Sequence, residues 1–279
     1  MKPSFYSGKS ALITGGSSGI GFALAKGIVA QGGNVAILAR RLEMLTSAAA
    51  GLEQSRQTPG QQILTIEADV TRLDELNAAL DSYKSQYGVP DIVINSAGVA
   101  HPGNFTATRP EIFHWMMDVN YFGTVNVLKN LVPDMEKRKS GTIVNISSIA
   151  GFIGVYGYTA YGASKFAVRG FSDALRSELK IHCIKVSVVF PPDTQTPQLE
   201  YESKIKPFIT REIGGSANLM SADAVAAEVL SKVARGRYII LPGSEGKILF
   251  VAQNLLGRSM YWVMDALIRG AIRKIKFGK

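Results

Sequence analysis

The chain has 279 residues, of which 46% are hydrophobic and 19% charged, a composition that excludes an intrinsically disordered protein. Its formal net charge of +9 suits nucleic acid, anionic lipid or an anionic cofactor as a ligand. Seven basic residues and one acidic residue lie in 246–279. Because much of the charge excess is in this tail, we expect no nucleic-acid-binding face.

The N-terminus and the apolar runs indicate where the chain resides. Residues 1–8 are short and polar and carry no secretory signal. The best membrane-span candidate, 248–257, ends after ten residues at Arg258, too short to cross a bilayer. We expect a cytoplasmic protein, with membrane association at the cytosolic face as an open alternative. The single cysteine, Cys183, excludes an intramolecular disulfide and is expected to be buried.

Short apolar runs alternate with longer amphipathic stretches up to about residue 245. The predicted strands are Ala11–Thr14, Asn34–Ala39, Ile63–Ala68, Ile92–Asn95, Thr142–Ser147, Lys185–Phe190 and Tyr238–Leu241. The predicted helices are Gly19–Gln31, Arg41–Glu53, Leu73–Gln86, Glu111–Lys137, Ala160–Lys180 and Ala222–Ala234. This alternation predicts an α/β fold of parallel βαβ units on one sheet.

The first predicted strand ends in a glycine-rich turn that opens a helix, Thr14-Gly15-Gly16-Ser17-Ser18-Gly19-Ile20-Gly21. Glycines let the backbone approach a pyrophosphate without Cβ clashes, and the free N–H groups of the helix attract that anion. Three glycines alone are a weak signal, but this position between a strand and a helix is typical of a dinucleotide site. We predict cofactor contacts from Gly15, Ser17, Ser18, Gly19, Ile20 and Gly21.

The end of the second strand indicates which dinucleotide is bound. An NAD site places an acidic residue there for the ribose 2′-hydroxyl, whereas this chain has Ala39-Arg40-Arg41 and no carboxylate before Glu43. A guanidinium can pair with a 2′-phosphate, so Arg40 favours NADPH. The alternative is that both arginines are solvated charges at the start of a helix.

The ends of the third and fourth strands supply further candidates. Asp69 can accept from the adenine amino group, although an N-cap role for Asp69 or Thr71 is an equal alternative. The small residues of Asn95-Ser96-Ala97-Gly98 suit a backbone that lies against the cofactor, and a simple tight turn would look the same. The predicted contacts at these two strand ends are Asp69, Val70, Asn95, Ala97 and Gly98.

Tyr161 and Lys165 are four residues apart in a predicted helix, so their side chains point the same way. A free phenol titrates near ~10, and a nearby ammonium stabilises phenolate and should lower the pKa of Tyr161. Ser148, which follows the fifth strand, is placed to hold a carbonyl oxygen while Tyr161 protonates it. Ser147 is the second choice, because alternation along a strand sends it to the opposite face.

Together these motifs resemble the short-chain dehydrogenase/reductase family, over about residues 8–245. The resemblance rests on the glycine-rich turn, Asn95-Ser96-Ala97-Gly98, Ser148 and Tyr161-Gly162-Ala163-Ser164-Lys165. It implies one Rossmann-type doubly wound domain with a seven-stranded parallel sheet and helices on both faces. It also implies NADPH-dependent ketone reduction and, commonly for the family, a homodimer or homotetramer.

The resemblance also implies the roles of four residues. Tyr161 is then the general acid, and Lys165 both lowers the pKa of that phenol and holds the nicotinamide ribose. Ser148 orients the substrate carbonyl, and Asn120 supports a water-mediated proton relay. We expect no metal, because the three histidines show no metal-ligand spacing.

The segment 191–220, rich in Pro, Thr and Gly, follows the sixth strand. We expect a substrate lid there, with a plain surface excursion as the alternative, and with Thr194 and Thr196 at the nicotinamide end. Its opening, Pro191-Pro192-Asp193-Thr194, resembles the 3-ketodihydrosphingosine reductase subgroup. That resemblance implies a lipid-like 3-keto sphingoid base as substrate. A 3-ketoacyl thioester, steroid or xenobiotic ketone is the alternative, and a non-catalytic nucleotide-binding scaffold a third.

Residues 246–279 are predicted to form a basic, amphipathic helical extension beyond a catalytic domain of residues 1–245. A basic amphipathic helix that contains aromatic residues can lie in a membrane interface, which would suit a lipid substrate. The competing interpretation is that the tail packs on its own domain or on a partner subunit.

Overall fold

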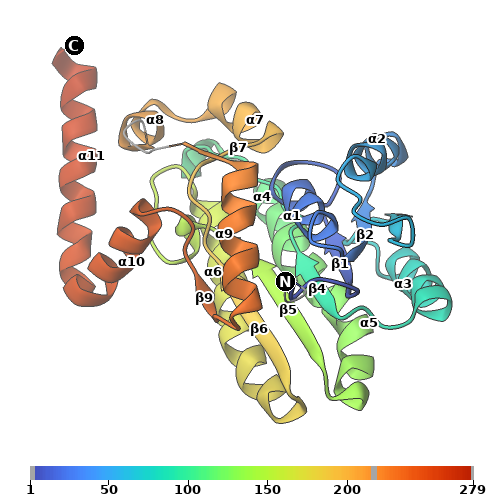
Figure 1. Cartoon of the computed structure of the whole chain (residues 1–279). Helices are drawn as coiled ribbons and strands as arrows, with labels where there is room; N and C mark the ends of the chain where they lie inside the picture. Colours follow the sequence, from blue (N-terminus) through green and yellow to red (C-terminus); the bar gives the residue numbers. More distant parts are fainter. Residues whose placement is uncertain (1–3, 215–218, 278–279) are drawn as a thin grey trace.

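The computed structural model describes residues 4–214 and 219–277. Seven strands form one parallel sheet in the order β3-β2-β1-β4-β5-β6-β9 (Figure 1). They are β1 (Ser10–Thr14), β2 (Asn34–Ala39), β3 (Ile63–Glu67), β4 (Ile92–Asn95), β5 (Gly141–Ile146), β6 (Ile184–Val189) and β9 (Ile239–Ile240). The predicted seven-stranded parallel sheet is confirmed.

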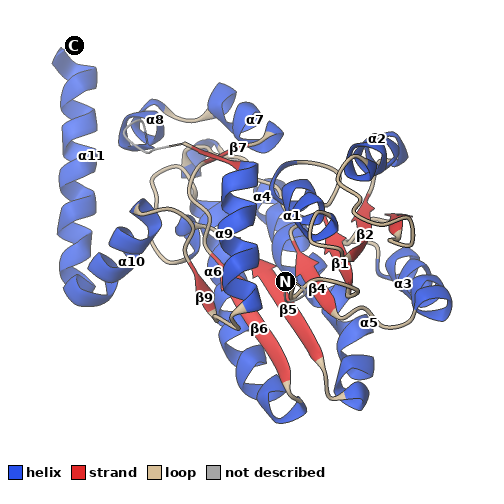
Figure 2. Cartoon of the chain, in the orientation of Figure 1, coloured by secondary structure: helices blue, strands red, loops and turns tan. Residues whose placement is uncertain are grey.

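Helices cover both faces of the sheet (Figure 2). One face packs against α1 (Gly19–Val29), α2 (Leu42–Glu53) and α9 (Ala222–Ala234). The opposite face packs against α3 (Leu73–Tyr87), α5 (Gly123–Arg138) and α6 (Thr159–Leu179). A further helix, α4 (Pro110–Met117), precedes α5. The architecture is therefore the predicted Rossmann-type doubly wound fold.

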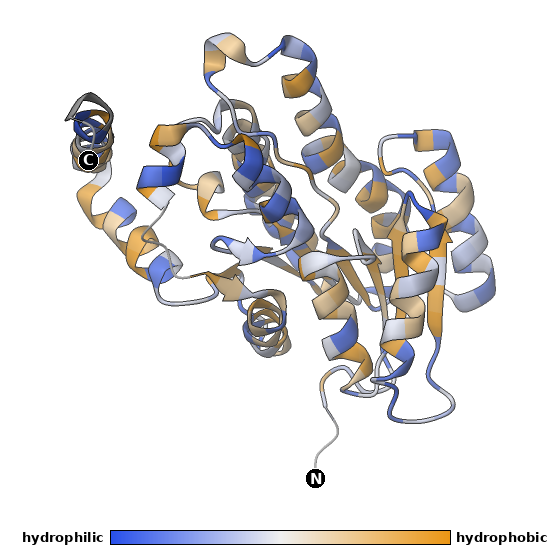
Figure 3. Cartoon of the chain, turned by 90° about the horizontal axis from the view of Figure 1, so that it is seen from above, coloured by the Kyte–Doolittle hydropathy of each residue, from blue (hydrophilic) through white to orange (hydrophobic). Residues whose placement is uncertain are grey.

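Two hydrophobic cores explain why the strands are apolar along their whole length. Ile13 and Ile37 pack on the side of α1, while Leu12 and Leu38 pack on the side of α3. Successive strand residues face opposite sides of the sheet, so both sets must be apolar when helices cover both faces. Figure 3 shows hydrophobic strands between helices of mixed hydropathy.

The strand order reverses beside β1, which pairs with β2 on one side and β4 on the other. The connections from β1 and from β4 leave on opposite faces at this point and open a crevice at the carboxyl ends of the strands.

The segment 191–220 contains regular structure that the sequence did not predict. Helix α7 (Pro197–Ile205) begins where the Thr196 side chain accepts a hydrogen bond from the Leu199 backbone N–H at 3.2 Å, with proline in the first helical position. Helix α8 (Phe208–Gly214) follows, and β7 (Thr194–Gln195) pairs with β8 (Met220–Ser221). Residues 215–218 of this predicted lid lie outside the described residues.

The C-terminal extension forms two helices, α10 (Glu245–Leu256) and α11 (Met260–Phe277). The chain turns between them at Gly257, whose φ of +49° favours glycine. Leu249, Phe250, Met260 and Met264 pack in one cluster with core side chains of the main fold. The tail therefore packs in part on its own domain, while α11 extends along the edge of the molecule (Figure 1).

Two expectations from composition have different outcomes. Within 4–214 and 219–277, no helix combines the length and the apolar character needed to cross a bilayer. Cys183, which was expected to be buried, is exposed; it follows a short helical turn and has the left-handed conformation with φ +58°.

Candidate active site

A cleft of about 580 Å³ lies at the carboxyl ends of the parallel strands. Sixteen of the predicted site residues line it, from the glycine-rich turn, the ends of β2, β3, β4 and β5, helix α6 and the segment 194–196. They are Gly15, Ser17, Ser18, Gly19, Ile20, Gly21, Arg40, Asp69, Val70, Ala97, Gly98, Ser148, Tyr161, Lys165, Thr194 and Thr196. Two predicted site residues, Asn95 and Asn120, are not among the lining residues.

The glycine-rich turn is packed so closely that larger residues do not fit. Gly15 has φ +66°, and a Cβ there would lie 2.8 Å from the Ala97 nitrogen. A Cβ on Gly21 would lie 2.3 Å from the Gly15 carbonyl oxygen. The N-cap of α1, Ser18, makes no side-chain capping bond, and the first turn has no acidic residue. The helix therefore directs unneutralised N–H groups into the cleft, which fits the pyrophosphate of a dinucleotide.

The ends of β2 and β3 meet where an adenosine ribose would lie. The Arg40 guanidinium is 3.6 Å from the Asp69 carboxylate and remains largely exposed, and Arg41 also lines the cleft. Burial alone would raise the pKa of Asp69, but hydrogen bonds from Thr71 and the charge of Arg40 outweigh it and hold that pKa below its ordinary value. This pair of arginines and one ionised aspartate suits a 2′-phosphate more than a bare 2′-hydroxyl.

The proposed helix-capping role of Asp69 or Thr71 is not what the structure shows. The Asp69 Oδ1 accepts bonds from the Thr71 backbone N–H at 2.9 Å and from its hydroxyl at 2.8 Å. These bonds form a local turn, and the N-cap of α3 is Arg72. The turn holds Asp69 at the edge of the cleft.

Asn95 has a structural position rather than a place in the cleft. It is buried, and its side-chain amide donates to the Asn145 Oδ1 at 2.9 Å, which links β4 to β5. The adjacent Ser96 and Ala97 do line the cleft. Their backbone N–H groups both donate to the Thr14 hydroxyl at 3.1 Å, a positioning contact that the sequence analysis missed.

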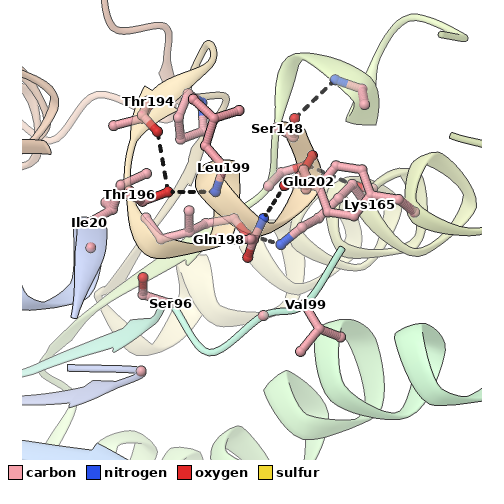
Figure 4. Close-up of a pocket in the computed structure, with 18 of the residues that line it drawn as sticks. Ile20, Ser96, Val99, Ser148, Lys165, Thr194, Thr196, Gln198, Leu199 and Glu202 are labelled. Carbon is pink, nitrogen blue, oxygen red and sulfur yellow. Dashed lines mark hydrogen bonds between the residues drawn. The ribbon is translucent and has the colours of Figure 1, made fainter. Parts of the chain in front are cut away.

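Ser148, Tyr161 and Lys165 lie together on one side of the cleft. The Lys165 Nζ is 5.7 Å from the centre of the Tyr161 ring and donates to the Ile146 carbonyl at 3.0 Å. The Ser148 oxygen accepts from the Ala150 N–H at 3.2 Å, which leaves its own O–H free to donate (Figure 4). Ser147, the second choice, is buried and donates to the Lys165 backbone carbonyl at 2.9 Å.

The pKa of Tyr161 differs from the expectation. Burial raises it above the ordinary value, and the charge of Glu202 adds to the rise, while hydrogen bonds with Ser148 and Gln198 oppose it. Desolvation and the Glu202 charge therefore dominate the pKa of Tyr161, and the lowering expected from the nearby Lys165 ammonium is not seen. Burial also lowers the pKa of Lys165 to about 8, with the charge of Glu202 opposing that shift.

Asn120 lies behind the loop that follows β4. Its Oδ1 accepts from the Val99 N–H at 2.7 Å, and its Nδ2 donates to the Val99 carbonyl at 3.0 Å and to the Ser164 hydroxyl at 2.8 Å. The predicted helix 111–137 is interrupted here by a π-helical turn, Asp118–Phe122, a feature often found at functional sites. A Cβ on Gly98 would lie 3.2 Å from Asn120 Oδ1 and 3.3 Å from Lys165 Nζ. Asn120 thus adjoins Lys165, and its relay role stays a prediction.

Thr194 and Thr196 close the cleft from the other side (Figure 4). The Thr194 hydroxyl donates to the Pro192 carbonyl at 2.7 Å, and the Thr196 hydroxyl donates to the Thr194 carbonyl at 3.2 Å. A Cβ on Gly19 would lie 3.1 Å from the Thr196 methyl group. The 191–197 segment therefore approaches the glycine-rich turn across the cleft.

Two groups of lining residues were not predicted from the sequence. The first is polar and comprises Tyr158, the N-cap residue of α6, with Gln198 and Glu202 from α7. The second is apolar and comes from the tail: Leu249, Met264 and Leu267. Neither group belongs to a recognisable motif, and the i, i+4 spacing of Gln198 and Glu202 on α7 was the one available signal.

The family model described as short chain dehydrogenase matches residues 9–206. The chain belongs to the short-chain dehydrogenase family. It is 34% identical over 249 residues to the 3-ketodihydrosphingosine reductase of Mus musculus, covering 89% of this chain and 75% of that protein. It is 37% identical over 283 residues to the 3-ketodihydrosphingosine reductase of Dictyostelium discoideum, covering 96% and 84%.

Solved structures agree with the fold. A short-chain dehydrogenase from Streptomyces avermitilis is similar with a TM-score of 0.78 and 26% identity, over 95% of this chain and 99% of that one. The L-sorbose reductase of Gluconobacter frateurii, solved with NADPH and L-sorbose, is similar with a TM-score of 0.73 and 24% identity, over 87% and 98%.

Proposed function

We propose that the chain is an NADPH-dependent reductase of a long-chain 3-keto sphingoid base, converting 3-ketodihydrosphingosine to dihydrosphingosine. The observation that carries the proposal is one cleft that holds the glycine-rich turn, Arg40 and the Ser148–Tyr161–Lys165 group together. The relatives named 3-ketodihydrosphingosine reductase in mouse and Dictyostelium support the substrate.

The mechanism follows from the contacts of these residues. NADPH, when bound, supplies the hydride to the carbonyl carbon. The Ser148 O–H, not needed by Ala150, donates to the carbonyl oxygen, and the Tyr161 hydroxyl transfers its proton to the same oxygen. Because burial raises the pKa of Tyr161, this phenol keeps its proton at neutral pH until a stronger base, the nascent alkoxide, forms beside it.

Lys165 and Asn120 have supporting roles in this proposal. Lys165 holds the nicotinamide ribose and stabilises the phenolate that remains after proton transfer. Asn120, fixed to Val99 and Ser164, supports the relay that returns a proton to Tyr161.

The test is NADPH oxidation with 3-ketodihydrosphingosine, a 3-ketoacyl thioester and a steroid ketone. We expect turnover of the first to exceed that of the others, and to be lost in Tyr161→Phe while NADPH binding, followed by nucleotide fluorescence, is retained. NADPH should be preferred to NADH, and Arg40→Ala should weaken that preference. Substantial activity of Tyr161→Phe would contradict the catalytic assignment, and preference for another ketone would contradict the substrate.

We also propose that residues 246–279 form an extension that rests on anionic lipid at the cytosolic face of a membrane. Five apolar or aromatic side chains of α10 and α11 are more than half exposed: Ile248, Val251, Leu255, Tyr261 and Trp262. Arg258, in the turn between these helices, and Arg269 and Arg273 of α11 are exposed as well. Since Leu249, Met264 and Leu267 of these helices line the cleft, a ketone leaving the bilayer would meet its apolar side.

Vesicle flotation tests this contact. The full chain should float with anionic vesicles, and Leu255→Glu with Trp262→Glu should abolish flotation without changing turnover of a short soluble ketone. Ile181→Glu is the matched control, because Ile181 is as exposed as Leu255, at 80%, but lies outside the tail. Flotation that is unaffected by the tail substitutions would contradict the contact.

The family resemblance further supports a homodimer or homotetramer, which light scattering of the full chain would test.

A further inference from the structure

Glu202 is a buried carboxylate within the cleft. Its side chain belongs to α7, is only 6% exposed and lies beside Gln198, as Figure 4 shows. Its Oε1 accepts from the Gln198 amide at 2.9 Å, and its Oε2 accepts from the Tyr158 hydroxyl. Both donors are neutral. The Gln198 amide carries no charge, and burial and the Glu202 charge raise the pKa of Tyr158, which keeps that hydroxyl protonated.

A second carboxylate near Tyr161, that of Asp193, is paired with a cation, the Lys206 ammonium, at 3.2 Å. Among the side chains that the structure describes, in residues 4–214 and 219–274, no Lys, Arg or His nitrogen lies within the 4.0 Å ion-pair distance of Glu202. A buried carboxylate without a cation is costly, so its position in the cleft points to a positive charge on the ligand.

Glu202 also lies close to the reacting oxygen. Gln198 links the two sites, because it donates to Glu202 and hydrogen bonds with Tyr161. The rings of Tyr158 and Tyr161 are 5.4 Å apart between centroids. The charge of Glu202 adds to the rise in the pKa of Tyr161 and opposes the fall in the pKa of Lys165. A cation held by Glu202 would therefore lie close to a carbonyl held by Tyr161.

We propose that Glu202 binds the ammonium group on the carbon adjacent to the ketone, which makes this residue a specificity determinant for α-amino ketones. The inference rests on the proposed function and deepens it. A carboxylate has about four acceptor positions, and Tyr158 and Gln198 use two, so hydrogen bonds to an ammonium can be added. The alkyl chain of such a substrate would extend along Leu249, Met264 and Leu267.

The experiment compares two ketones that differ only in the amine. One is 3-ketodihydrosphingosine and the other is its analogue with hydrogen in place of the amino group, both as short-chain soluble versions. We expect the wild type to prefer the amino ketone in kcat/KM, and Glu202→Gln to lose about 10- to 100-fold on it while changing little on the analogue. Glu200→Gln is the matched control, because Glu200 is on the same helix but exposed and outside the cleft.

Binding of the amino alcohol product, measured by calorimetry without turnover, gives a second readout. It should weaken in Glu202→Gln, whereas binding of the amine-free diol should not. Equal losses on both ketones would show that Glu202 only supports Tyr158 and Gln198, and would overturn the inference. A wild type that reduces both ketones equally also overturns it while the reductase function stands, even if Glu202→Gln does not fold. A wild type that reduces neither ketone refutes the proposed function as well.

Discussion

Lys165 is a charged side chain that the fold keeps away from water. It is 5% exposed, and burial lowers its pKa from 10.5 to about 8. Below pH 8 the amine is charged in both the folded and unfolded protein, so folding bears the whole desolvation cost. Above 10.5 the amine is neutral in both states and the cost vanishes.

Lys165→Met is therefore expected to stabilise the nucleotide-free protein by about 1–3 kcal/mol at pH 7 while abolishing turnover. The gain should shrink as the pH rises from about 8 to 10.5, because the wild type then binds fewer protons when folded than when unfolded. Urea unfolding of both proteins across this range measures the difference. A variant less stable than wild type at pH 7 would show that the bond from Lys165 to the Ile146 carbonyl outweighs burial.

At the residue scale, the sequence predicted which residues form the site better than it predicted the surroundings of each side chain. Tyr161 and Lys165 are one helical turn apart, and Ser148 follows a strand whose carboxyl end faces the cleft. Their meeting in one cleft was therefore predictable. The pKa of Tyr161 was not, because it depends on burial and on Glu202, which reaches the cleft from a distant segment. Asn95 shows the same limit, since its neighbour in the sheet, Asn145, decides which way its amide points.

Among the elements, the glycine-rich turn and the start of α1 have the least room for change. A Cβ on Gly21 would meet the Gly15 carbonyl oxygen at 2.3 Å, and backbone atoms on both sides must move to relieve it. Gly21→Ala should weaken NADPH binding by more than about 10-fold and destabilise the protein by about 1–3 kcal/mol. Nucleotide titration and thermal unfolding measure the two effects.

Gly170→Ala in α6 is the matched control for that substitution. No heavy atom lies within 4 Å of the site of its Cβ, and alanine favours helix by about 0.5–1 kcal/mol over glycine. It should leave NADPH affinity unchanged and stability equal or higher. Similar losses of affinity in the two variants would mean that the turn does not hold the pyrophosphate.

Element prediction succeeded where periodicity alone decides structure. Strands covered on both faces are apolar throughout, and β2 and β4 have the predicted bounds, Asn34–Ala39 and Ile92–Asn95. In the 191–220 segment, proline and threonine suggested irregular structure, but Thr196 and Pro197 instead begin α7. A threonine followed by proline is compatible with the start of a helix and with a loop. Only the contacts of the residues that follow distinguish the two.

At the scale of the whole molecule, the tail packs against the core through side-chain contacts. The Phe250 ring of α10 lies 5.2 Å from that of Phe152 and 6.2 Å from that of Phe190, between centroids. The Arg169 guanidinium lies 5.8 Å from the Phe250 ring, over the same cluster. Removing the tail would expose this cluster. Single substitutions in the tail instead test separately the residues that pack on the core and those that face solvent.

Phe250→Ala should destabilise the protein by about 2–4 kcal/mol, because it removes a partly buried ring from an aromatic cluster. Leu255→Ala on the same helix should change stability by less than about 0.5 kcal/mol, since Leu255 is 80% exposed. Denaturant unfolding of both variants at one pH measures the contrast. Equal, small effects would mean that α10 separates from the domain in solution, so that the apolar side of the cleft is not built by the tail. The predicted contrast instead makes α10 part of the substrate site, with its exposed face left for a membrane or a partner.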